Sequence, residues 1–262
     1  MRLAAVARHV APFVSSRRVP VHSQRVRVRD RCIHVSSNKD SLPSPSTSTN
    51  GGMGEIIDEQ VAYDRYLTVF DRTVEFPPGA NGHTGDTPLK VKYDIVGHPR
   101  VNYRFAVIFP FHPACVETGT PPSVTIIREY CQASNEMGYS LPTGGFNPKK
   151  HKNLAQSAKD ELAEEAMLKG TVVDMLDDID GEHPGFVEGK WCSNRFRPYL
   201  ALDLQSIANP PARDVEEFSI EISKVTVPEF KKIMYSGKMM VPSIVTANMA
   251  LDRLVREGFA LE

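Results

Sequence analysis

The chain has 262 residues, of which 41% are hydrophobic and 24% charged, with 31 Lys and Arg against 32 Asp and Glu. This balance is that of a globular protein and excludes a chain that is disordered throughout. No apolar run reaches the ~20 residues that a membrane-spanning helix needs, so we expect no membrane partner.

The first 52 residues differ in composition from the rest. Up to Arg31 there are eight arginines and one acidic residue, Asp30, and a tract rich in Ser, Pro, Thr and Gly follows at 41–52. Such a composition is typical of an organelle transit peptide and its flexible exit. We therefore expect residues 1–52 to be a cleaved leader, with the chloroplast as the first destination and the mitochondrion as the second. A basic arm that binds nucleic acid is the alternative.

Without the leader, the charge balance is acidic. Residues 53–262 contain 22 Lys and Arg against 30 Asp and Glu. An acidic surface repels polyanions, so we expect no nucleic-acid partner for this part of the chain. A phosphorylated substrate would be held instead by metal ions and a few well-placed arginines.

The segment after the leader, residues 53–104, predicts a small antiparallel β subdomain. Apolar and polar residues alternate at 66–76 and at 89–96, and a turn rich in Pro and Gly at 77–82 separates the two runs. Alternation with a period of two residues on both sides of such a turn predicts two antiparallel strands.

Residues 105–262 predict a larger α/β domain. Runs of β-branched and aromatic residues predict strands, and apolar residues repeating every three to four positions predict helices. The expected strands are 105–111, 123–130, 196–202 and 217–222, and the expected C-terminal helices are 228–236 and 243–257.

The most informative stretch runs from Gly144 to Leu168. A short strand at 139–143 leads into a predicted tight turn at Gly144 and Gly145, where glycine permits close approach of the backbone. The helix that follows has an apolar stripe, which allows it to dock on a core. The stripe consists of Leu154, Ala158, Leu162 and Ala166.

Three carboxylates lie beside that stripe on the same helix. Glu161, Glu164 and Glu165 are spaced i, i+3 and i+4, so their side chains share one face. Carboxylates that converge repel one another unless a cation neutralises them, and oxygen ligands suit Mg²⁺ or Mn²⁺. A solvated acidic face is the alternative. The strand, the glycines and the acidic helix together indicate a site for a metal-bound phosphate.

This stretch resembles the signature of the Nudix hydrolases, which ends in Arg-Glu-U-x-Glu-Glu-x-Gly-U, where U is aliphatic. Asp160 to Leu168 reproduce its glutamates and its final aliphatic position. The resemblance implies that Glu161, Glu164 and Glu165 bind the catalytic metals. It also implies a Nudix α/β/α sandwich with a mixed sheet, preceded by the small antiparallel β subdomain.

The signature is incomplete in this chain. Lys152 stands where the family has its first glutamate, Asp160 replaces the arginine, and Met167 replaces the last glycine. Asp160 adds negative charge to a cluster that already repels itself. A compensating cation is available in Lys152 or in the nearby Lys149 and Lys150.

Other segments resemble the ADP-ribose and ADP-sugar pyrophosphatase branch of the family. Arg128 lies on a predicted strand, where the branch has an arginine that holds the diphosphate. The acidic run at 213–217 resembles a loop of the branch, which implies that Glu216 or Glu217 acts as general base or orients the attacking water. Residues 236–251 resemble the closing helix of the branch.

The resemblance and the residue chemistry together define the candidate site. We expect Glu165 to take part in catalysis along with the acidic loop, and Gly144 and Gly145 to approach the substrate. Arg128 would bind phosphate, although a surface strand residue in a weak ion pair is the alternative. Trp191 would stack on the nucleoside or, alternatively, serve as a packing anchor.

The function that the resemblance implies is metal-dependent hydrolysis of the diphosphate in a nucleoside diphosphate linked to another moiety. ADP-ribose or an ADP-sugar is the first candidate, and AMP and a sugar phosphate would be the products. One alternative is a nucleotide sensor that binds without hydrolysis. Another is an interaction module. The resembled branch commonly dimerises through its N-terminal strands, so a homodimer is the expected assembly.

Overall fold

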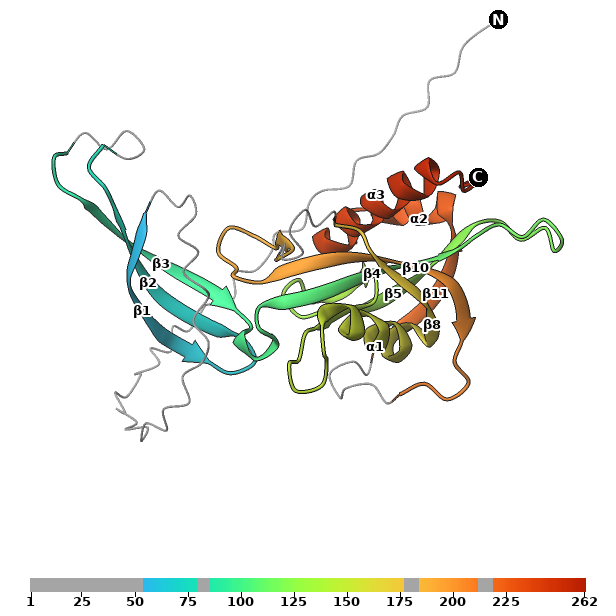
Figure 1. Cartoon of the computed structure of the whole chain (residues 1–262), viewed down its shortest axis with the longest axis horizontal. Coiled ribbons are helices and arrows are strands. Elements are labelled where there is room, and N and C mark those ends of the chain that lie inside the picture. The colour runs from blue at the N-terminus through green and yellow to red at the C-terminus, as the bar shows by residue number, and fades with distance from the viewer. Residues whose placement is uncertain (1–53, 80–84, 177–183, 212–218) are drawn as a thin grey trace, which may run out of the picture. The chain divides into compact units, whose positions relative to one another are not determined.

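The computed structural model describes residues 54–79, 85–176, 184–211 and 219–262, which all belong to one compact unit spanning residues 41–262 (Figure 1). The predicted leader and the candidate residues Glu216 and Glu217 lie outside the described residues. No helix in the described ranges is both long and apolar enough to cross a membrane.

A three-stranded antiparallel sheet comes first, in the order β1-β2-β3. The two predicted strands are β2 (Thr68–Phe76) and β3 (Leu89–Gly97), and β1 (Glu55–Asp64) precedes them. The sequence pattern missed β1 because the strand pairing shifts register twice, once after Ile56 and once after Val61. A bulge inserts an extra residue, and this interrupts the alternation of apolar and polar positions.

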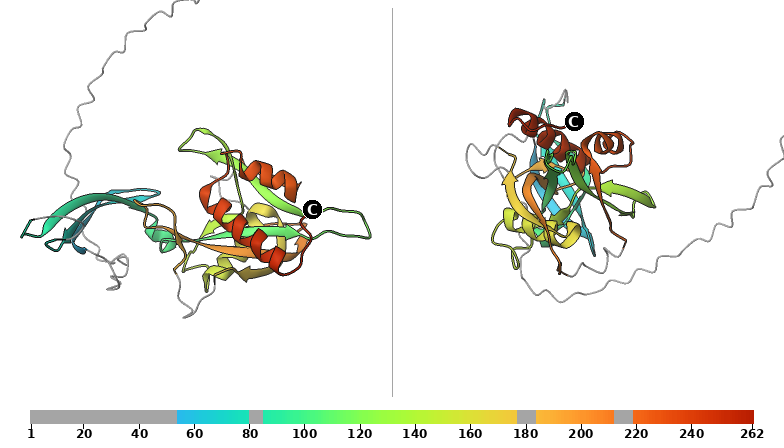
Figure 2. Two further views of the ribbon diagram at one scale, coloured as in Figure 1. Left: turned by 90° about the horizontal axis from the view of Figure 1, so that it is seen from above. Right: turned by 90° about the vertical axis from the view of Figure 1, so that its right-hand side faces the viewer.

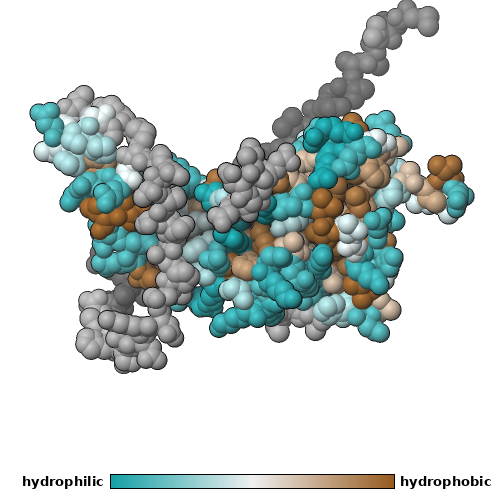
Figure 3. All heavy atoms as spheres, in the orientation of Figure 1, coloured by the Kyte–Doolittle hydropathy of each residue, from teal (hydrophilic) through white to brown (hydrophobic). Residues whose placement is uncertain are grey.

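The two faces of this sheet differ in polarity. Val61, Phe70 and Ile95 lie directly opposite one another, so they share a face. On the other face, Lys90 and Lys92 form ion pairs with acidic residues of β2, each at 3.2 Å. Some of the apolar side chains reach the surface, where Figure 3 shows hydrophobic atoms over the sheet.

The larger sheet is mixed and has eight strands in the described part of the chain. Its central order is β11-β5-β4-β10-β8, with β6 paired to β5, β7 to β4 and β9 to β10. Strands β4 and β10 are parallel, and the other pairs are antiparallel. The strands are β4 (Arg104–His112), β5 (Ser123–Cys131), β6 (Glu136–Ser140), β7 (Thr143–Gly145), β8 (Leu168–Asp174), β9 (Phe186–Val187), β10 (Arg195–Ser206) and β11 (Glu221–Thr226).

Helices lie on both faces of the larger sheet. Figures 1 and 2 show α1 (Leu154–Ala166) on one side, and α2 (Val227–Met234) and α3 (Val241–Arg256) on the other. Ala106 and Ile108 of β4 pack in the cluster that includes α1. Their neighbours along the strand pack in the cluster that includes α2 and α3. A strand buried on both faces reads as a continuous apolar run, as β4 does.

Strands β4 and β5 separate along their length. They pair through Phe111 and Val124 and through the next residue pair. Farther along, β7 takes the edge of β4 while β6 takes the edge of β5. The chain from β6 to β7 thus fills the gap and carries Gly144 and Gly145 next to α1. The tight turn predicted for these glycines is wrong, because both lie in strand β7.

Candidate active site

Helix α1 is well defined at both ends. At its start, the Asn153 side chain accepts a hydrogen bond from the Gln156 N–H at 2.9 Å, which satisfies a donor that the first turn leaves unpaired. At its end, Met167 is left-handed, with φ 56°. Glycine adopts this conformation at the least cost, so Met167 is a strained replacement for the glycine of the signature. The predicted apolar stripe is confirmed: Ala158, Leu162 and Ala166 are buried, and Leu154 packs against them.

One side of α1 lies along β7. The Ser157 hydroxyl donates to the Gly145 carbonyl at 3.1 Å. Two turns later, the Glu165 carboxylate accepts the Thr143 N–H at 2.7 Å. Glu165 is 6% exposed. This hydrogen bond therefore holds α1 against β7.

Between those two contacts, Glu161 faces Gly144. A Cβ atom added to Gly144 would lie 1.8 Å from the Glu161 carboxyl group. Residues four apart in a helix stack on one face, which is why Glu161 lies between Ser157 and Glu165. The missing side chain at Gly144 makes room for the Glu161 carboxylate.

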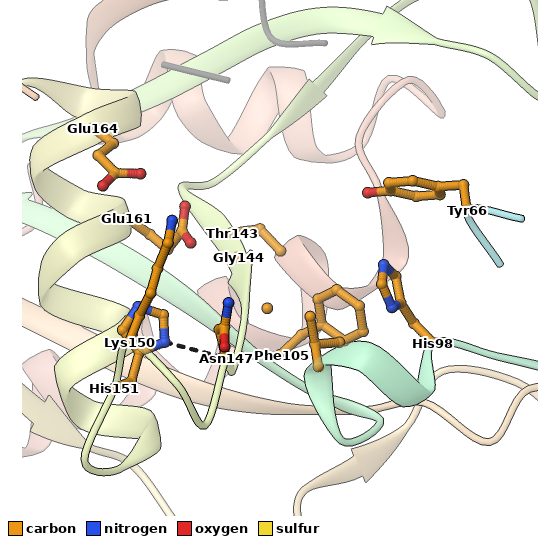
Figure 4. Close-up of a pocket in the computed structure, with 12 residues that line it drawn as sticks. Tyr66, His98, Phe105, Thr143, Gly144, Asn147, Lys150, His151, Glu161 and Glu164 are labelled. Atoms are coloured by element: carbon orange, nitrogen blue, oxygen red, sulfur yellow. Dashed lines mark hydrogen bonds between the residues drawn. The ribbon is translucent and has the colours of Figure 1, made fainter. Parts of the chain in front are cut away.

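A pocket of about 280 Å³ opens beside this contact. In Figure 4, Glu161 and Glu164 project from α1 on one side, and Tyr66 and His98 lie on the opposite side. Strand β7 and the loop that follows it supply many of the other residues that line the pocket. The other lining residues are Val101, Phe105, Thr143, Gly144, Gly145, Asn147, Lys150 and His151.

The side opposite α1 is aromatic. The Tyr66 and His98 rings meet edge to face with their centroids 5.0 Å apart, and the His98 and Phe105 centroids are 6.2 Å apart. His98 is buried, and its backbone N–H donates to the Asn194 side-chain oxygen at 2.8 Å. Aromatic rings on one side and carboxylates on the other give the pocket two chemically different halves.

The replaced arginine of the signature has a local consequence. Asp160, which stands in its place, accepts a hydrogen bond from the Gln156 side chain at 2.8 Å. Its other oxygen lies 3.6 Å from Nε2 of the buried His151. Of the three lysines considered as compensating cations, Lys150 lines the pocket, and Lys149 and Lys152 do not.

The carboxylates of this pocket suit a divalent cation that is bound partly by the protein and partly by the substrate. Within the described ranges, no group of three or more His, Cys, Asp or Glu side chains is placed to hold a metal ion. Glu161 and Glu164 line the pocket, whereas Glu165 is turned to β7. Mg²⁺ is usually bound by one or two carboxylates together with substrate phosphates and water. The two pocket carboxylates fit that mode.

Two other predicted residues lie outside the pocket. The Arg128 guanidinium pairs with Glu221 at 3.0 Å across the β5 and β11 pair, which agrees with the surface alternative. Trp191 is 64% exposed, with the Lys190 ammonium 5.8 Å from its ring centroid. A side chain exposed to this extent contributes little to packing, which disfavours the alternative of a packing anchor. Neither residue lines the pocket.

The sequence reasoning missed the aromatic half of the pocket. Tyr66 lies between β1 and β2, His98 follows β3, and Phe105 belongs to β4. No motif links these three positions. The one available signal was His98 directly before Pro99, because such a dipeptide marks a break between elements where side chains can converge.

No protein-family model and no curated protein matches the sequence of this chain. Its fold does match solved structures. One of them is described as the crystal structure of an ADP compounds hydrolase; it is 15% identical, has a TM-score of 0.55, and the match covers 79% of this chain and 97% of that one. Likeness at this identity establishes the fold alone. The chain therefore has a mixed α/β fold of the same type as that solved structure.

Proposed function

We propose that the protein is a Nudix-type hydrolase that depends on Mg²⁺ or Mn²⁺. It cleaves the diphosphate of a nucleoside diphosphate linked to another moiety. ADP-ribose or an ADP-sugar is the first candidate substrate, and AMP and a sugar phosphate are the products. The observation that carries the proposal is the meeting of Glu161, Glu164 and the side-chain-free Gly144 in one pocket. The fold shared with an ADP compounds hydrolase supports it.

Each residue of the acidic half has a defined task in this proposal. Glu161 and Glu164 would hold the divalent cation, which would neutralise charge at phosphorus and lower the pKa of the attacking water. Gly144 leaves the room in which the Glu161 carboxylate lies. Glu165 keeps β7 against α1, because it accepts the Thr143 N–H. Glu216 or Glu217, just before β11 in the chain, orients the water.

The aromatic half suits the nucleoside. Tyr66, His98 and Phe105 offer ring faces and edges on which a planar base can pack. With the phosphates at Glu161 and Glu164, the base points towards these rings. The base and the phosphates of a nucleoside diphosphate match this division of the pocket better than a simple phosphate ester does.

The test is a panel of diphosphates assayed with Mg²⁺ and a coupled phosphatase. The wild-type chain is expected to act on ADP-ribose or an ADP-sugar. Glu161→Gln and Glu164→Gln remove a negative ligand each, so kcat/KM should fall by about 100-fold or more. Glu136→Gln, at an exposed position of β6 outside the pocket, is the control and should match wild type.

Two outcomes would contradict the proposal. Turnover of no diphosphate in the panel would exclude the hydrolase. Full activity in both pocket variants would exclude the metal site. Circular dichroism of each variant verifies that the fold is retained.

A nucleotide sensor without turnover is the second candidate. It is favoured by Lys150, because a lysine on the pocket lining offsets the carboxylate charge without a metal. A thermal shift with ADP-ribose in the presence of EDTA, combined with no turnover in Mg²⁺, would favour the sensor over the hydrolase.

A further inference from the structure

The loop between β7 and α1 has a conformation set by Asn147. The backbone N–H groups of Lys150 and His151 both donate to the Asn147 carbonyl, at 3.0 and 2.8 Å. The Lys149 N–H donates to the Asn147 side-chain oxygen at 2.9 Å. Three consecutive N–H groups therefore converge on one residue, and the backbone that carries Lys150 is held in place.

His151 fastens this loop to helix α1. Its side chain is buried, and its Nδ1 accepts the Asn147 N–H at 3.1 Å. An accepting Nδ1 leaves the proton on Nε2, and Nε2 lies 3.6 Å from Asp160 on α1. The Phe146 ring packs against the imidazole, with centroids 6.2 Å apart. The loop is thus fixed at the residue next to Lys150.

Lys150 is singled out by its place in the pocket. Among the described residues, it is the one Lys or Arg that lines the pocket. Figure 4 shows it on the same side as Glu161, across from Tyr66 and His98. Arg128, which the family resemblance assigned to the diphosphate, instead pairs with Glu221 away from the pocket.

We propose that Lys150 binds a phosphate oxygen of the substrate, in the role that the resemblance gave to Arg128, and that His151 and Asp160 position it. The inference rests on the proposed function of this pocket. A diphosphate at Glu161 and Glu164 meets two negative side chains, so a positive donor beside them offsets the repulsion. The ammonium group of a lysine donates to phosphate as a compact point charge.

The first experiment compares lysines within one loop in the full chain. Lys150→Ala should raise the KM for ADP-ribose about tenfold to a hundredfold, with a smaller change in kcat, because the contact forms in the ground state as well. Lys150→Arg should restore most of the loss. Lys149→Ala and Lys152→Ala make the same change in net charge at exposed positions outside the pocket, and should leave KM within about twofold.

Salt provides a readout that a structural role would not change. The KM of wild type and of Lys149→Ala should rise with NaCl, because ions screen the attraction between lysine and phosphate. The KM of Lys150→Ala should depend less on salt. Equal KM values and equal salt dependence in Lys150→Ala and Lys149→Ala would overturn the assignment.

A second pair of variants tests the positioning residues. Asp160→Asn changes a partly exposed side chain and should keep the fold, while raising KM several-fold. In the Lys150→Ala background the same change should add little, because residues that act through one contact are not additive. His151→Gln should likewise raise KM several-fold and add little in the Lys150→Ala background. Circular dichroism verifies that this variant folds. An equal effect of Asp160→Asn in both backgrounds would overturn the positioning role.

Calorimetric titration of ADP-ribose in EDTA separates the two proposals. Binding that weakens in Lys150→Ala but not in Lys149→Ala, with no turnover in Mg²⁺, would refute the hydrolase and support Lys150. Turnover with the same KM in both variants would refute Lys150 alone. Neither binding nor turnover of any nucleotide would refute both.

Discussion

Gly144 determines where the Glu161 carboxylate can lie. A Cβ at this position would fall 1.8 Å from the carboxyl group, well inside the contact distance of two heavy atoms. Because the obstructing group is the end of a flexible side chain, the cost of a substitution falls on the position of Glu161 more than on the fold. The glycine is therefore a functional residue in the proposed site.

Gly144→Ala is expected to fold and to lose activity. Displacement of the Glu161 carboxylate should lower kcat/KM with Mg²⁺ by about tenfold or more, since misplacement of a catalytic group by an ångström is costly. Circular dichroism and steady-state kinetics measure the two effects. Gly189→Ala is the control, because nothing lies within 4 Å of a Cβ added there. Wild-type kinetics in Gly144→Ala would contradict the proposed contact.

At the scale of residues, the structure also shows what the sequence motif leaves undetermined. The signature placed Glu161, Glu164 and Glu165 on one helix face, and the structure has all three on α1. Two of them line the pocket, and one carboxylate oxygen of Glu165 accepts the Thr143 N–H. Helical spacing decides which residues share a face, but the neighbouring strand decides which of them is used to hold that strand.

At the scale of elements, α1 is the best predicted part of the chain. Its apolar stripe is a local signal, and the structure confirms it. Strands β2 to β5 were recognised from alternation or from continuous apolar runs. Strand β1 was missed at its bulges, and β7 was taken for a turn because two glycines reduce strand propensity.

Met167 gives a test of how α1 ends. Its φ of 56° carries the cost of a side chain in the left-handed region, about 1–2 kcal/mol. Met167→Gly should raise the free energy of unfolding by roughly 0.5–1 kcal/mol, after the entropy that glycine gains in the unfolded chain is subtracted. Urea unfolding measures the change. Met167→Ala keeps a Cβ and should bring no gain; a glycine variant less stable than the alanine variant would contradict this account.

At the scale of the whole molecule, we expect the free energy of unfolding to depend on pH through His112. This residue lies at the end of β4, where β4 pairs with β5. Burial, with a smaller contribution from the nearby positive charge of Lys224, lowers the pKa of His112 from 6.5 to about 4. Its Nε2 lies 2.9 Å from the Thr125 hydroxyl. Between pH 6.5 and 4 the unfolded chain binds a proton that the folded chain does not, so stability rises with pH across this window.

The melting temperature should therefore fall as the pH is lowered from 7 to about 4.5. His112→Gln keeps a side chain able to hydrogen-bond Thr125 and removes the titrating group, so the dependence on pH should be shallower. Thermal unfolding at a series of pH values compares the slopes of the two proteins. Equal slopes would show that His112 is not the group responsible.

The sequence by itself determined the α/β class and the acidic helix with its three glutamates, because helical period and apolar alternation are written in neighbouring residues. Only the tertiary structure decided which side chains surround them. Tyr66, His98 and Lys150 line one pocket with Glu161, and β7, which pairs with β4 and lies against α1, supplies residues between them. That pairing joins residues far apart in the chain, and no local pattern specifies it.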